Sequence, residues 1–389
     1  MTMHIRGATV QVTLSFFTQA TGWHKPLPDV DSSQTLVLVF SPPDGEQYQT
    51  AIKHLHTHYP QAVIAGCSTV AGIFNEHLLE NAVVVGIIHF ETSRLAFTSA
   101  ELPHADDSFQ AGKQIATTLN APDLKGIFVL TDGLNTNGSA LIRGMASVVN
   151  EAKVTIVGGL ASDKMQFVST WVLDQGEAVS QRVTGVGFYG KKLVFTSYAR
   201  DGFKPFGPER VITRSAGNTL YEIDGRPALQ LYKEYLGEHA NNLPAMALHF
   251  PLAIWNDTKD HYVVRTVVSI NEADDSLGFV ADIPQGYSTQ LMYGSFDNLL
   301  DGAETASRSL AERLPPQTPV FALTISCSGR KLVMGDDTDQ ELEATLDNLP
   351  AGSQQLGFYS YGELAPNAFG GRCCLHNETM TLTVMYEGS

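Results

Sequence analysis

The decisive stretch of this sequence reads GIFVL (126–130), TDGLNTN (131–137), SALIRGMASVVNEA (139–152), VTIVG (154–158) and GLAS (159–162). A short apolar run, a loop, a helical pattern and a second apolar run follow one another, and a Gly-rich turn ends the series. This order is typical of a β-α-β unit, in which a helix connects two parallel strands. The stretch therefore predicts an α/β fold.

The same series of segments occurs twice more in the chain. LVLVF (36–40) leads through a loop and a helical stretch to the turn GCST (66–69). VFALTI (320–325) begins a looser copy, which leads into GFYSYGE (357–363). Because the crossover connections are right-handed, we expect the loops of all three units to lie on one edge of a sheet.

The chain is too long for one ordinary core, so the sequence predicts two domains of repeated β-α-β units. The boundary is expected in the Gly-, Pro- and charge-rich segment 200–225. Pairs of apolar runs between the units predict mixed sheets with added hairpins. These expected hairpins pair 83–90 with 94–102, 183–190 with 192–199, and 261–270 with 276–283.

Composition limits the classes of partner. The formal net charge of −16 would repel nucleic acid and an anionic membrane surface, so neither is expected as a partner. Four cysteines without a C-x-x-C motif favour a reducing compartment. The N-terminus does not resemble a signal peptide, and the best apolar run, AVVVGIIHF (82–90), is too short to span a bilayer. We therefore expect a cytoplasmic protein without membrane insertion.

The turn GCST is the first candidate ligand site. Gly66 permits a tight turn, and the hydroxyls and N–H groups of Ser68 and Thr69 are able to hold an anion or a polar ligand. The alternative is a buried turn of small residues in which Cys67 is a core thiol. Cys67 as a nucleophile is a further alternative, but no activating base is identifiable.

The loop TDGLNTNG (131–138) precedes a helix and contains a second candidate, Asp132. It lacks the Lys of a P-loop and the G-x-G-x-x-G pattern, so it does not predict a nucleotide site. Asp132 and Asn137 are also suited to capping the helix and shaping the turn. Another cap is expected where Thr338 and Glu341 form a T-x-x-E capping box.

The strings SCSGR (326–330) and GFYSYGE (357–363) contain the densest cluster of polar candidates. Arg330 presents a planar fork for a carboxylate, with Glu363 as an alternative ion-pair partner. Tyr359 and Tyr361 alternate along a strand and are expected on one face. That face forms a pocket wall or part of the core. The candidate ligand residues of this cluster are Cys327, Arg330, Tyr359, Tyr361 and Glu363.

Histidines provide the candidate metal ligands. His376, in LHNET (375–379), and His249, in ALHFPLAIW, are able to bind a haem iron through a ring nitrogen. The alternative for His376 is a histidine that holds the last strand by hydrogen bonds. HLHTH (54–58) puts His54 and His58 on one helix face, where zinc would need another ligand and a solvated face is the alternative.

Several motifs in order resemble the FIST family, with a FIST N-terminal domain at 34–215 and a FIST C-terminal domain at 216–385. The N-domain resemblance rests on AGCSTVAGIF (65–74) and VGGLASD (157–163). The C-domain resemblance rests on VITRSAGNTLYEIDGRPALQLYKEYLG (211–237), FPLAI (250–254), YVVR (262–265), CSGR (327–330) and GFYSYGELAP (357–366), with LHNETMTL just beyond.

The resemblance implies an intracellular sensory protein that binds a small ligand. Some stand-alone bacterial members of the family (NosP-type) are nitric-oxide-sensing haem proteins that regulate a partner histidine kinase in a two-component system. By analogy, the ligand would be haem b and, through it, nitric oxide. His376 and His249 are our own assignment of the axial ligand, since the resemblance does not fix it.

Two other functions are compatible with the sequence. The first is a metal-free sensor of an amino acid or related metabolite, in which Arg330 holds the carboxylate and Glu363 or Asp132 meets the amine. The second is an enzyme that uses Cys67 or Cys327, which requires a base and an oxyanion site. The sequence identifies neither of these groups, so we expect a protein that is not an enzyme.

Overall fold

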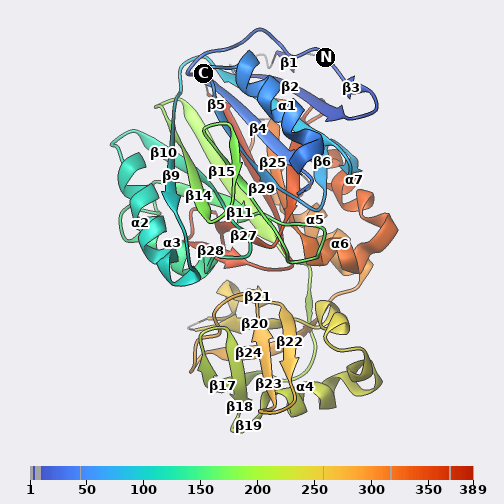
Figure 1. The fold of residues 1–389 in the computed structure, drawn as a ribbon. Helices are drawn as coiled ribbons and strands as arrows, with labels where there is room; N and C mark the ends of the chain where they lie inside the picture. Colours follow the sequence, from blue (N-terminus) through green and yellow to red (C-terminus); the bar gives the residue numbers. More distant parts are fainter. Residues whose placement is uncertain are drawn as a thin grey trace.

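A computed structural model describes residues 3–4, 10–43, 45–256, 258–315, 318–367 and 369–388. The chain forms a large body of three mixed sheets, and a small unit projects from one end of it (Figure 1). Residues 204–293 build the sheet of the small unit, and the chain enters and leaves it through neighbouring strands. The predicted α/β class with mixed sheets is confirmed.

Three β-α-β units form the centres of the three sheets of the large body. In each unit a helical segment connects two parallel, hydrogen-bonded strands. The units are β4 (Thr35–Ser41), α1 (Gly45–His58) and β5 (Val63–Ser68); β10 (Leu124–Thr131), α3 (Gly138–Ala146) and β11 (Thr155–Leu160); β25 (Phe321–Cys327), α6 (Ser328–Met334), α7 (Asp339–Asp347) and β26 (Gln354–Ser360).

The chain links the three units by exchanging strands between sheets. After each unit a hairpin joins the edge of another sheet, and the next strand returns antiparallel to the first strand of its own unit. The hairpins are β6 (Gly72–Phe74) with β7 (His77–Leu79), β12 (Val172–Asp174) with β13 (Glu177–Val179), and β27 (Gly362–Pro366) with β28 (Cys373–His376). The returning strands are β8 (Val83–Phe90), β14 (Arg182–Tyr189) and β29 (Met380–Glu387).

One further strand gives all three sheets the same six-strand order, and the first sheet also has two short strands beside β2, β1 (Met3–His4) and β3 (Gly22–Trp23). β9 (Arg94–Glu101) and β15 (Leu193–Arg200) cross to the sheet of the following unit, and β2 (Val10–Thr18) takes the same place in the first sheet. The resulting orders are β2-β8-β4-β5-β12-β13, β9-β14-β10-β11-β27-β28 and β15-β29-β25-β26-β6-β7. The large body is therefore a closed ring of three interlocked sheets.

Two of the three expected hairpins are wrong. β8 and β9 lie in different sheets, and so do β14 and β15. Both edges of β8 are already hydrogen-bonded to β2 and β4, so β9 pairs with β14 instead. The third hairpin, in which β22 (Val267–Asn271) pairs with β23 (Ser276–Phe279), is confirmed. The three β-α-β loops also belong to three sheets rather than to one sheet edge.

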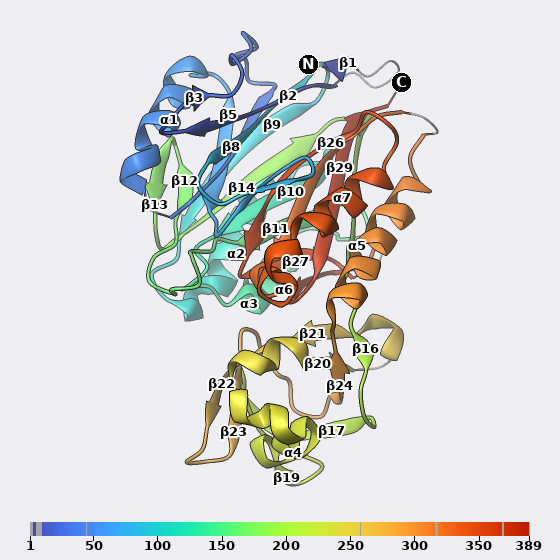
Figure 2. The ribbon, with the colours of Figure 1, turned by 90° about the vertical axis from the view of Figure 1, so that its right-hand side faces the viewer.

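The inner faces of the three sheets share one apolar core. Leu38 of β4, Phe128 of β10 and Leu323 of β25 are all fully or almost fully buried in it. Helices cover the outer faces, as the rotated view shows (Figure 2). α1 covers the first sheet, α2 (Ser108–Leu119) and α3 the second, and α5 (Phe296–Ala311) with α7 the third.

A glycine in the second strand of each unit allows the parallel pair to come together. Cβ atoms at Gly66, Gly158 and Gly357 would lie 2.0, 1.8 and 1.6 Å from a carbonyl oxygen of the first strand. A separation below 3.0 Å does not occur for real Cβ atoms, so each of these positions requires glycine. The three glycines therefore occupy equivalent places in the three units.

The small unit has its own antiparallel sheet and its own core, against which α4 (Ala228–Leu236) packs. Its principal strands are β17 (Arg210–Ala216), β18 (Thr219–Ile223), β20 (Leu252–Trp255), β21 (Val263–Arg265), β22, β23 and β24 (Ser288–Tyr293), and β16 (Lys204–Pro205) pairs with β24.

The predicted domain ranges 34–215 and 216–385 remain a prediction about the sequence. In space, strands from both ranges share sheets, because β6 pairs with β26 and β27 pairs with β11. No helix formed by the described residues is both long enough and apolar enough to cross a lipid bilayer.

Candidate functional site

The turns that end β5, β11 and β26 meet at the centre of the large body. Thr69 Oγ1 and Ser162 Oγ both donate hydrogen bonds to the carbonyl of Tyr359, at 2.9 and 2.5 Å. The Val70 N–H donates to Ser162 Oγ at 3.0 Å, and the Ser162 N–H donates to the Ser68 carbonyl at 3.0 Å. These contacts hold the three units together.

The predicted ligand segment Gly66–Thr69 lies inside this junction. Cys67, Ser68 and Thr69 are each fully buried, and their surroundings are other turns of the protein. Burial raises the pKa of the Cys67 thiol well above its ordinary value. Burial is also the main cause of the raised pKa of Cys327, to which the carboxyls of Glu363 and Glu378 add. A raised pKa disfavours the thiolate that nucleophilic catalysis needs.

Asp132 fastens the loop after β10 to the rest of the large body. Its carboxylate accepts hydrogen bonds from Thr170 Oγ1 at 2.5 Å and from the Gln181 N–H at 2.6 Å. The Leu134 N–H and Asn135 Nδ2 donate to it at 3.0 Å each. Burial acts to raise the pKa of Asp132, but these hydrogen bonds outweigh it and lower the pKa. Asp132 is therefore an anionic anchor of the loop.

Arg330 is paired with a carboxylate that the sequence reading assigned to a helix cap. Glu341 Oε2 lies 2.7 Å from Nη2 and 3.1 Å from Nε of Arg330, and both side chains are fully buried. The remaining N–H groups of Arg330 donate to the carbonyls of Asp201, Leu299 and Glu378. The ion-pair partner is thus Glu341 rather than Glu363, and the guanidinium has no donor left for a ligand carboxylate.

The expected capping box at Thr338 and Glu341 does not form. Thr338 has helical backbone angles, and its side chain makes no cap hydrogen bond. Glu341 points into the body instead, where Ser326 Oγ and Tyr359 Oη donate to its Oε1 at 2.9 and 2.7 Å. Loss of one member of such a buried pair typically costs about 3–5 kcal/mol, so the pair is a structural element.

Tyr359 and Tyr361 do not share a face. β26 ends at Ser360, and the regular alternation of side chains ends with it. Tyr359 reaches Glu341, whereas Tyr361 Oη donates to Asp163 and its ring stacks on Phe167 with the centroids 4.7 Å apart. The cluster predicted around these tyrosines is therefore divided between two regions of the large body.

Glu363 belongs to a fully buried group of polar side chains that includes Glu378. Ser360 Oγ and the Thr379 N–H donate to Glu363, and Thr266 Oγ1 of the small unit donates to Glu378 Oε1 at 3.2 Å. Burial raises the pKa of Glu363 well above its ordinary value. Burial is also the main cause of the raised pKa of Glu378, which is about 7. A Cβ at Gly329 would collide with the Glu378 carboxylate, so the two segments are in close contact.

The predicted haem ligands, His376 and His249, line neither of the two cavities that lie between the large body and the small unit. His376 is buried on β28, and its Nε2 donates to the Ala365 carbonyl at 3.0 Å. Burial lowers the pKa of His376 to about 4, so its ring is neutral. His249 Nδ1 lies 3.2 Å from the Gly294 carbonyl. The hydrogen bond of His376 occupies one of its two ring nitrogens, so only Nδ1 remains for an iron.

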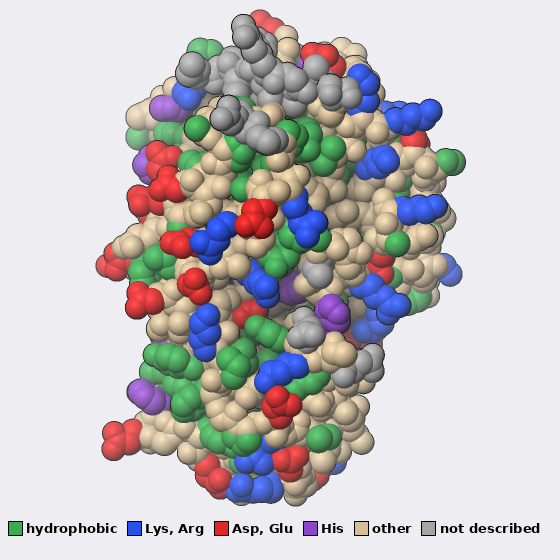
Figure 3. All heavy atoms as spheres, turned by 180° about the vertical axis from the view of Figure 1, so that it is seen from behind, with side chains coloured by type: hydrophobic (Ala, Val, Ile, Leu, Met, Phe, Trp, Pro, Cys, Tyr) green, Lys and Arg blue, Asp and Glu red, His purple; other side chains and the backbone are tan. Residues whose placement is uncertain are grey.

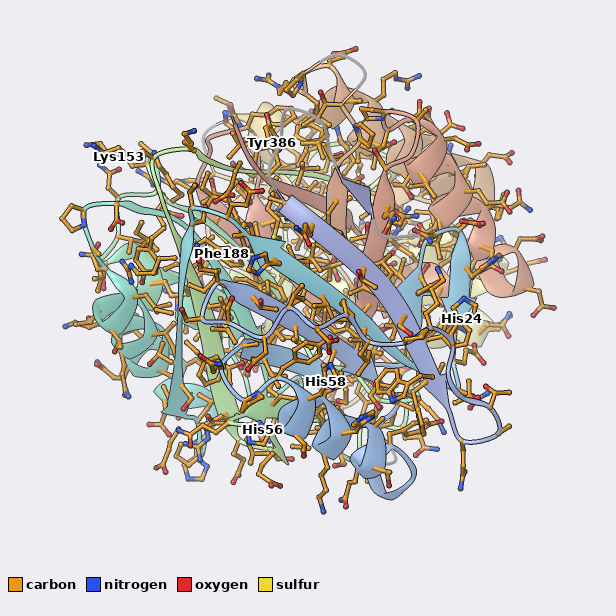
Figure 4. All side chains as sticks on the ribbon, turned by 90° about the horizontal axis from the view of Figure 1, so that it is seen from above. His24, His56, His58, Lys153, Phe188 and Tyr386 are labelled. Atoms are coloured by element: carbon orange, nitrogen blue, oxygen red, sulfur yellow. The ribbon has the colours of Figure 1, made fainter. Side chains whose placement is uncertain are left out.

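The histidines of α1 do not form a metal centre. His56 and His58 lie on this helix, and His24 lies apart from them (Figure 4). Trp23 Nε1 donates to His54 Nδ1 at 2.8 Å, which places that ring in an aromatic contact. Among the described residues, no group of three or more His, Cys, Asp or Glu side chains is arranged to hold a metal ion.

A cleft between the large body and the small unit is the best candidate for a small-ligand site. Its volume is about 870 Å³, which is within the range of pockets for small molecules. The loop after β10 and residues 165–167 form one wall, and residues of the small unit form the other. The apolar side chains that line this cleft are Ala105, Leu134, Leu160, Met165, Phe167, Pro244, Ala245, Leu248, Val267, Val268 and Val280.

Acidic and amide groups lie at the edges of the cleft. Asp282 of the small unit accepts hydrogen bonds from Asn137 Nδ2 at 3.0 Å and from Arg143 Nη1 at 3.3 Å. Asp106 also lines the cleft, and the described lining residues include no Lys or Arg. Asp282 therefore joins the two bodies and lines the cleft between them.

Asp163 builds the loop that presents Phe167 to the cleft. It accepts hydrogen bonds from the N–H groups of four residues, Gln166, Phe167, Val168 and Ser169, at 2.8–3.2 Å. Met165 and Phe167 both have positive φ angles, 60° and 54°, which are unusual for residues with side chains. The Phe167 side chain is 56% exposed. Strained backbone of this kind concentrates at ligand sites.

Sequence reasoning missed Asp163, Phe167, Glu341 and Asp282. Asp163 follows the glycine turn of the second unit, so its position in VGGLASD was a usable signal. Asp282 and Phe167 carried no such signal, because their partners lie more than a hundred residues away in the sequence. Of the predicted ligand residues, none lines the cleft directly; Asp132 and Tyr361 lie immediately behind its wall.

Family models match most of the chain. The FIST N domain model matches residues 35–226, and the FIST C domain model matches residues 228–366. An uncharacterized protein of Mycobacterium tuberculosis is 23% identical over 240 residues, which are 60% of this chain and 61% of the relative. An uncharacterized protein of Methanocaldococcus jannaschii is 24% identical over 221 residues, or 54% of this chain and 42% of the relative.

The chain thus spans less than two thirds of the length of these curated relatives. Among solved structures, PurLQS from Thermotoga maritima aligns with 99% of this chain and 74% of its own. The TM-score is 0.23 at 9% identity, which is too low to indicate a shared fold.

Proposed function

This chain belongs to the FIST-domain proteins, which are associated with sensing and signal transduction, and from this premise we propose that it senses a small organic ligand. The cleft between the large body and the small unit is the observation that carries the proposal. It combines a size suited to a metabolite, apolar walls and a few polar groups, which is the usual composition of a ligand site.

The chemistry of the cleft favours a ligand with an amino group and an apolar side chain. Asp282 and Asp106 supply negative charge at its edges, and the described lining residues supply no cationic side chain. A carboxylate on the same ligand would face Asn137 and the N-terminus of α3, where N–H groups and the helix dipole favour an anion. An amino acid or a related amine meets both conditions.

The position of the cleft supplies a way to transmit the signal. Its two walls belong to different bodies, and Asp282 bridges them through Asn137 and Arg143. A ligand that contacts both walls stabilises the arrangement in which they are close, and thereby shifts the population of positions of the small unit. A partner protein that distinguishes these positions would read the signal.

The haem-based alternative is a sensor that binds haem b and nitric oxide and regulates a partner histidine kinase. Its support is the resemblance to the nitric-oxide-sensing members of the family. The residues do not fit it in this cleft, because His376 and His249 do not line the cleft and the Nε2 of His376 is bonded to Ala365. We therefore rank the metal-free metabolite sensor first.

A thermal-shift screen of amino acids and amines tests the proposed function. We expect one class of compounds to raise the Tm in a saturable way, since a ligand that binds only the folded state stabilises it. Leu248→Trp should fill the cleft and abolish the shift. Val211→Trp, on an exposed side chain outside the cleft, should retain it.

A parallel haem titration decides between the two candidates. A stoichiometric Soret band that moves when nitric oxide is added, together with no response to any amine or amino acid, would overturn the metabolite proposal. A response that Leu248→Trp leaves unchanged would show that the ligand binds outside the cleft.

A further inference from the structure

Arg265 is a buried cation that forms no salt bridge with a carboxylate among the described residues, although the Asp282 carboxylate is close enough to act on its pKa. It lies on β21, and its side chain is only 6% exposed. Nη1 donates to the carbonyls of Leu375 and Val264, at 2.9 and 3.0 Å, and Nε donates to the Asp282 carbonyl at 3.4 Å. All of these acceptors are neutral main-chain groups. No described residue accepts a hydrogen bond from Nη2.

Arg330 has a salt-bridged carboxylate partner that Arg265 lacks. Arg330 is also buried, but the Glu341 carboxylate lies 2.7 Å from it and balances its charge. Burial of an unbalanced charge is costly, so buried charges in proteins are normally paired with a counter-charge. Burial lowers the pKa of Arg265 to about 10, although the nearby Cys374 and Asp282 side chains act to raise it, and Arg265 stays protonated at neutral pH. The positive charge therefore persists in the folded protein.

Arg265 lines a cavity of about 430 Å³ between the large body and the small unit. Arg143 of α3 and Arg372, just before β28, line the same cavity. Asp282 is the only carboxylate among its described lining residues, and it is already bound to Arg143. In a chain with a formal charge of −16, this is a local excess of positive charge. Seen from behind, Lys, Arg and His side chains gather around the junction of the two bodies (Figure 3).

The opposite wall of this cavity is apolar and aromatic. Ile254 and Trp255 of β20 line it together with Tyr287 and Val263. Aromatic side chains supply contact area for a flat apolar group. An arginine beside such a wall holds a carboxylate or phosphate through its planar fork of donors. The cavity and the cleft share only Asp282 among their described lining residues, so the two are separate sites.

We propose that this arginine cavity is a second ligand site, which binds a carboxylate or phosphate carried on an aromatic or other apolar group. The anion balances the charge of Arg265, and the apolar group lies against Trp255. The proposal goes beyond the amine-binding function of the cleft and does not depend on it. Ligand in the arginine cavity also contacts both bodies, which gives the molecule two sites at one junction.

Tryptophan fluorescence provides a direct test, because Trp255 lines the cavity and the other two tryptophans, Trp23 and Trp171, lie in or near the first sheet. Benzoate and phenyl phosphate are titrated as anions, with benzyl alcohol and benzylamine as uncharged and cationic matches. We expect a saturable fluorescence change with one or both anions, and none with the alcohol or the amine. Trp255→Phe should remove the fluorescence change while calorimetry still detects binding.

Substitution of single arginines identifies which of them bind the anion. Arg265→Gln is expected to weaken anion binding by about tenfold or more, and Arg372→Gln, an exposed position, by a few-fold. Arg308→Gln, on the exposed side of α5, should leave the affinity unchanged. If Arg265→Gln does not fold, the anion affinities of Arg372→Gln and Arg308→Gln are compared, and a weaker affinity of Arg372→Gln supports the proposed site.

The proposal would be overturned if wild type and Arg372→Gln bound benzoate and phenyl phosphate with equal affinity, and if Arg265→Gln, where it folds, also bound these anions with the affinity of wild type. The same holds if benzyl alcohol binds as tightly as the anions, or if neither anion binds at millimolar concentration. Because the amine screen concerns a different cavity, failure there leaves this result unaffected.

Discussion

At the scale of single residues, two buried carboxyls, Glu363 and Glu378, lie beside the end of the third β-α-β unit. Both are fully buried, and Glu378 Oε2 has no hydrogen-bond partner among the described residues. Ser328 Oγ and both polar atoms of the Asn377 side chain are likewise buried without a partner. Buried polar atoms of this kind are usually satisfied by internal water. The region is therefore a polar interior rather than an apolar core.

The raised pKa of Glu378 predicts how stability depends on pH. Its pKa rises from 4.5 to about 7 on folding, chiefly through burial. Between these two values the folded state holds a proton that the unfolded state has released, so the free energy of unfolding falls as the pH rises. The loss is at most about 1.4 kcal/mol per pH unit for one proton, and it ends above the folded pKa.

Urea unfolding of wild type and Glu378→Gln between about pH 5 and pH 8 measures this effect. The groups that face Glu378 are Arg330, Glu341, Glu363 and Cys327, with Thr266 from the small unit. Glu378→Gln resembles the protonated form, so its stability should fall less steeply with pH than that of wild type. Parallel curves for the two proteins would show that Glu378 does not titrate in this range.

At the scale of elements, the glycine in the second strand of each unit explains why the β-α-β repeat can be recognised in the sequence. Gly66, Gly158 and Gly357 stand at equivalent places because each faces a carbonyl of the neighbouring strand. Apolar runs and glycine turns are local signals, so they predicted the three units and their order correctly. The side-chain roles within the units could not be predicted in the same way. Glu341 has the spacing of a capping residue, yet its real partner, Arg330, lies on another helix.

Gly357→Ala tests the requirement for glycine. The added Cβ would lie 1.6 Å from the Thr324 carbonyl oxygen, so β25 and β26 must move apart. We expect a loss of about 1–3 kcal/mol or more in the free energy of unfolding, as for other overpacked sites. Gly388→Ala is the control, because its nearest heavy atom is 3.6 Å away. Equal stability of the two variants would contradict the role assigned to Gly357.

At the scale of the whole molecule, the closed ring could not be predicted from the sequence. Each sheet takes strands from at least two units, and the register between them depends on contacts such as β6 with β26, nearly 300 residues apart. Consecutive strands such as β8 and β9 resemble a hairpin in the sequence because each contains a run of apolar residues and a short turn joins them. Only the competition for strand edges within the assembled ring sends them to different sheets.

The ring is complete without the small unit, so the large body should fold alone. Lys204 of β16 and Tyr293 of β24 are paired neighbours, and about two residues in a tight turn are enough to join them in place of residues 205–292. The shortened protein loses the contacts of Thr266 with Glu378 and of Asp282 with Arg143. It also removes Ala253, Trp255 and Met292 from the apolar cluster that contains Leu299. We therefore expect lower stability but a single cooperative transition.

Circular dichroism in the near ultraviolet and calorimetry measure the outcome. Fixed aromatic packing in the ring, such as that of Phe40 on Phe358, should preserve the near-ultraviolet signal, and one heat-absorption peak should remain at a reduced Tm. The matched control is the full chain with Val211→Trp, which keeps both bodies. A shortened protein with normal far-ultraviolet but no near-ultraviolet signal would be a molten globule. That result would mean that the small unit is needed to close the ring, because the three sheets alone would then lack the packing that fixes their mutual register.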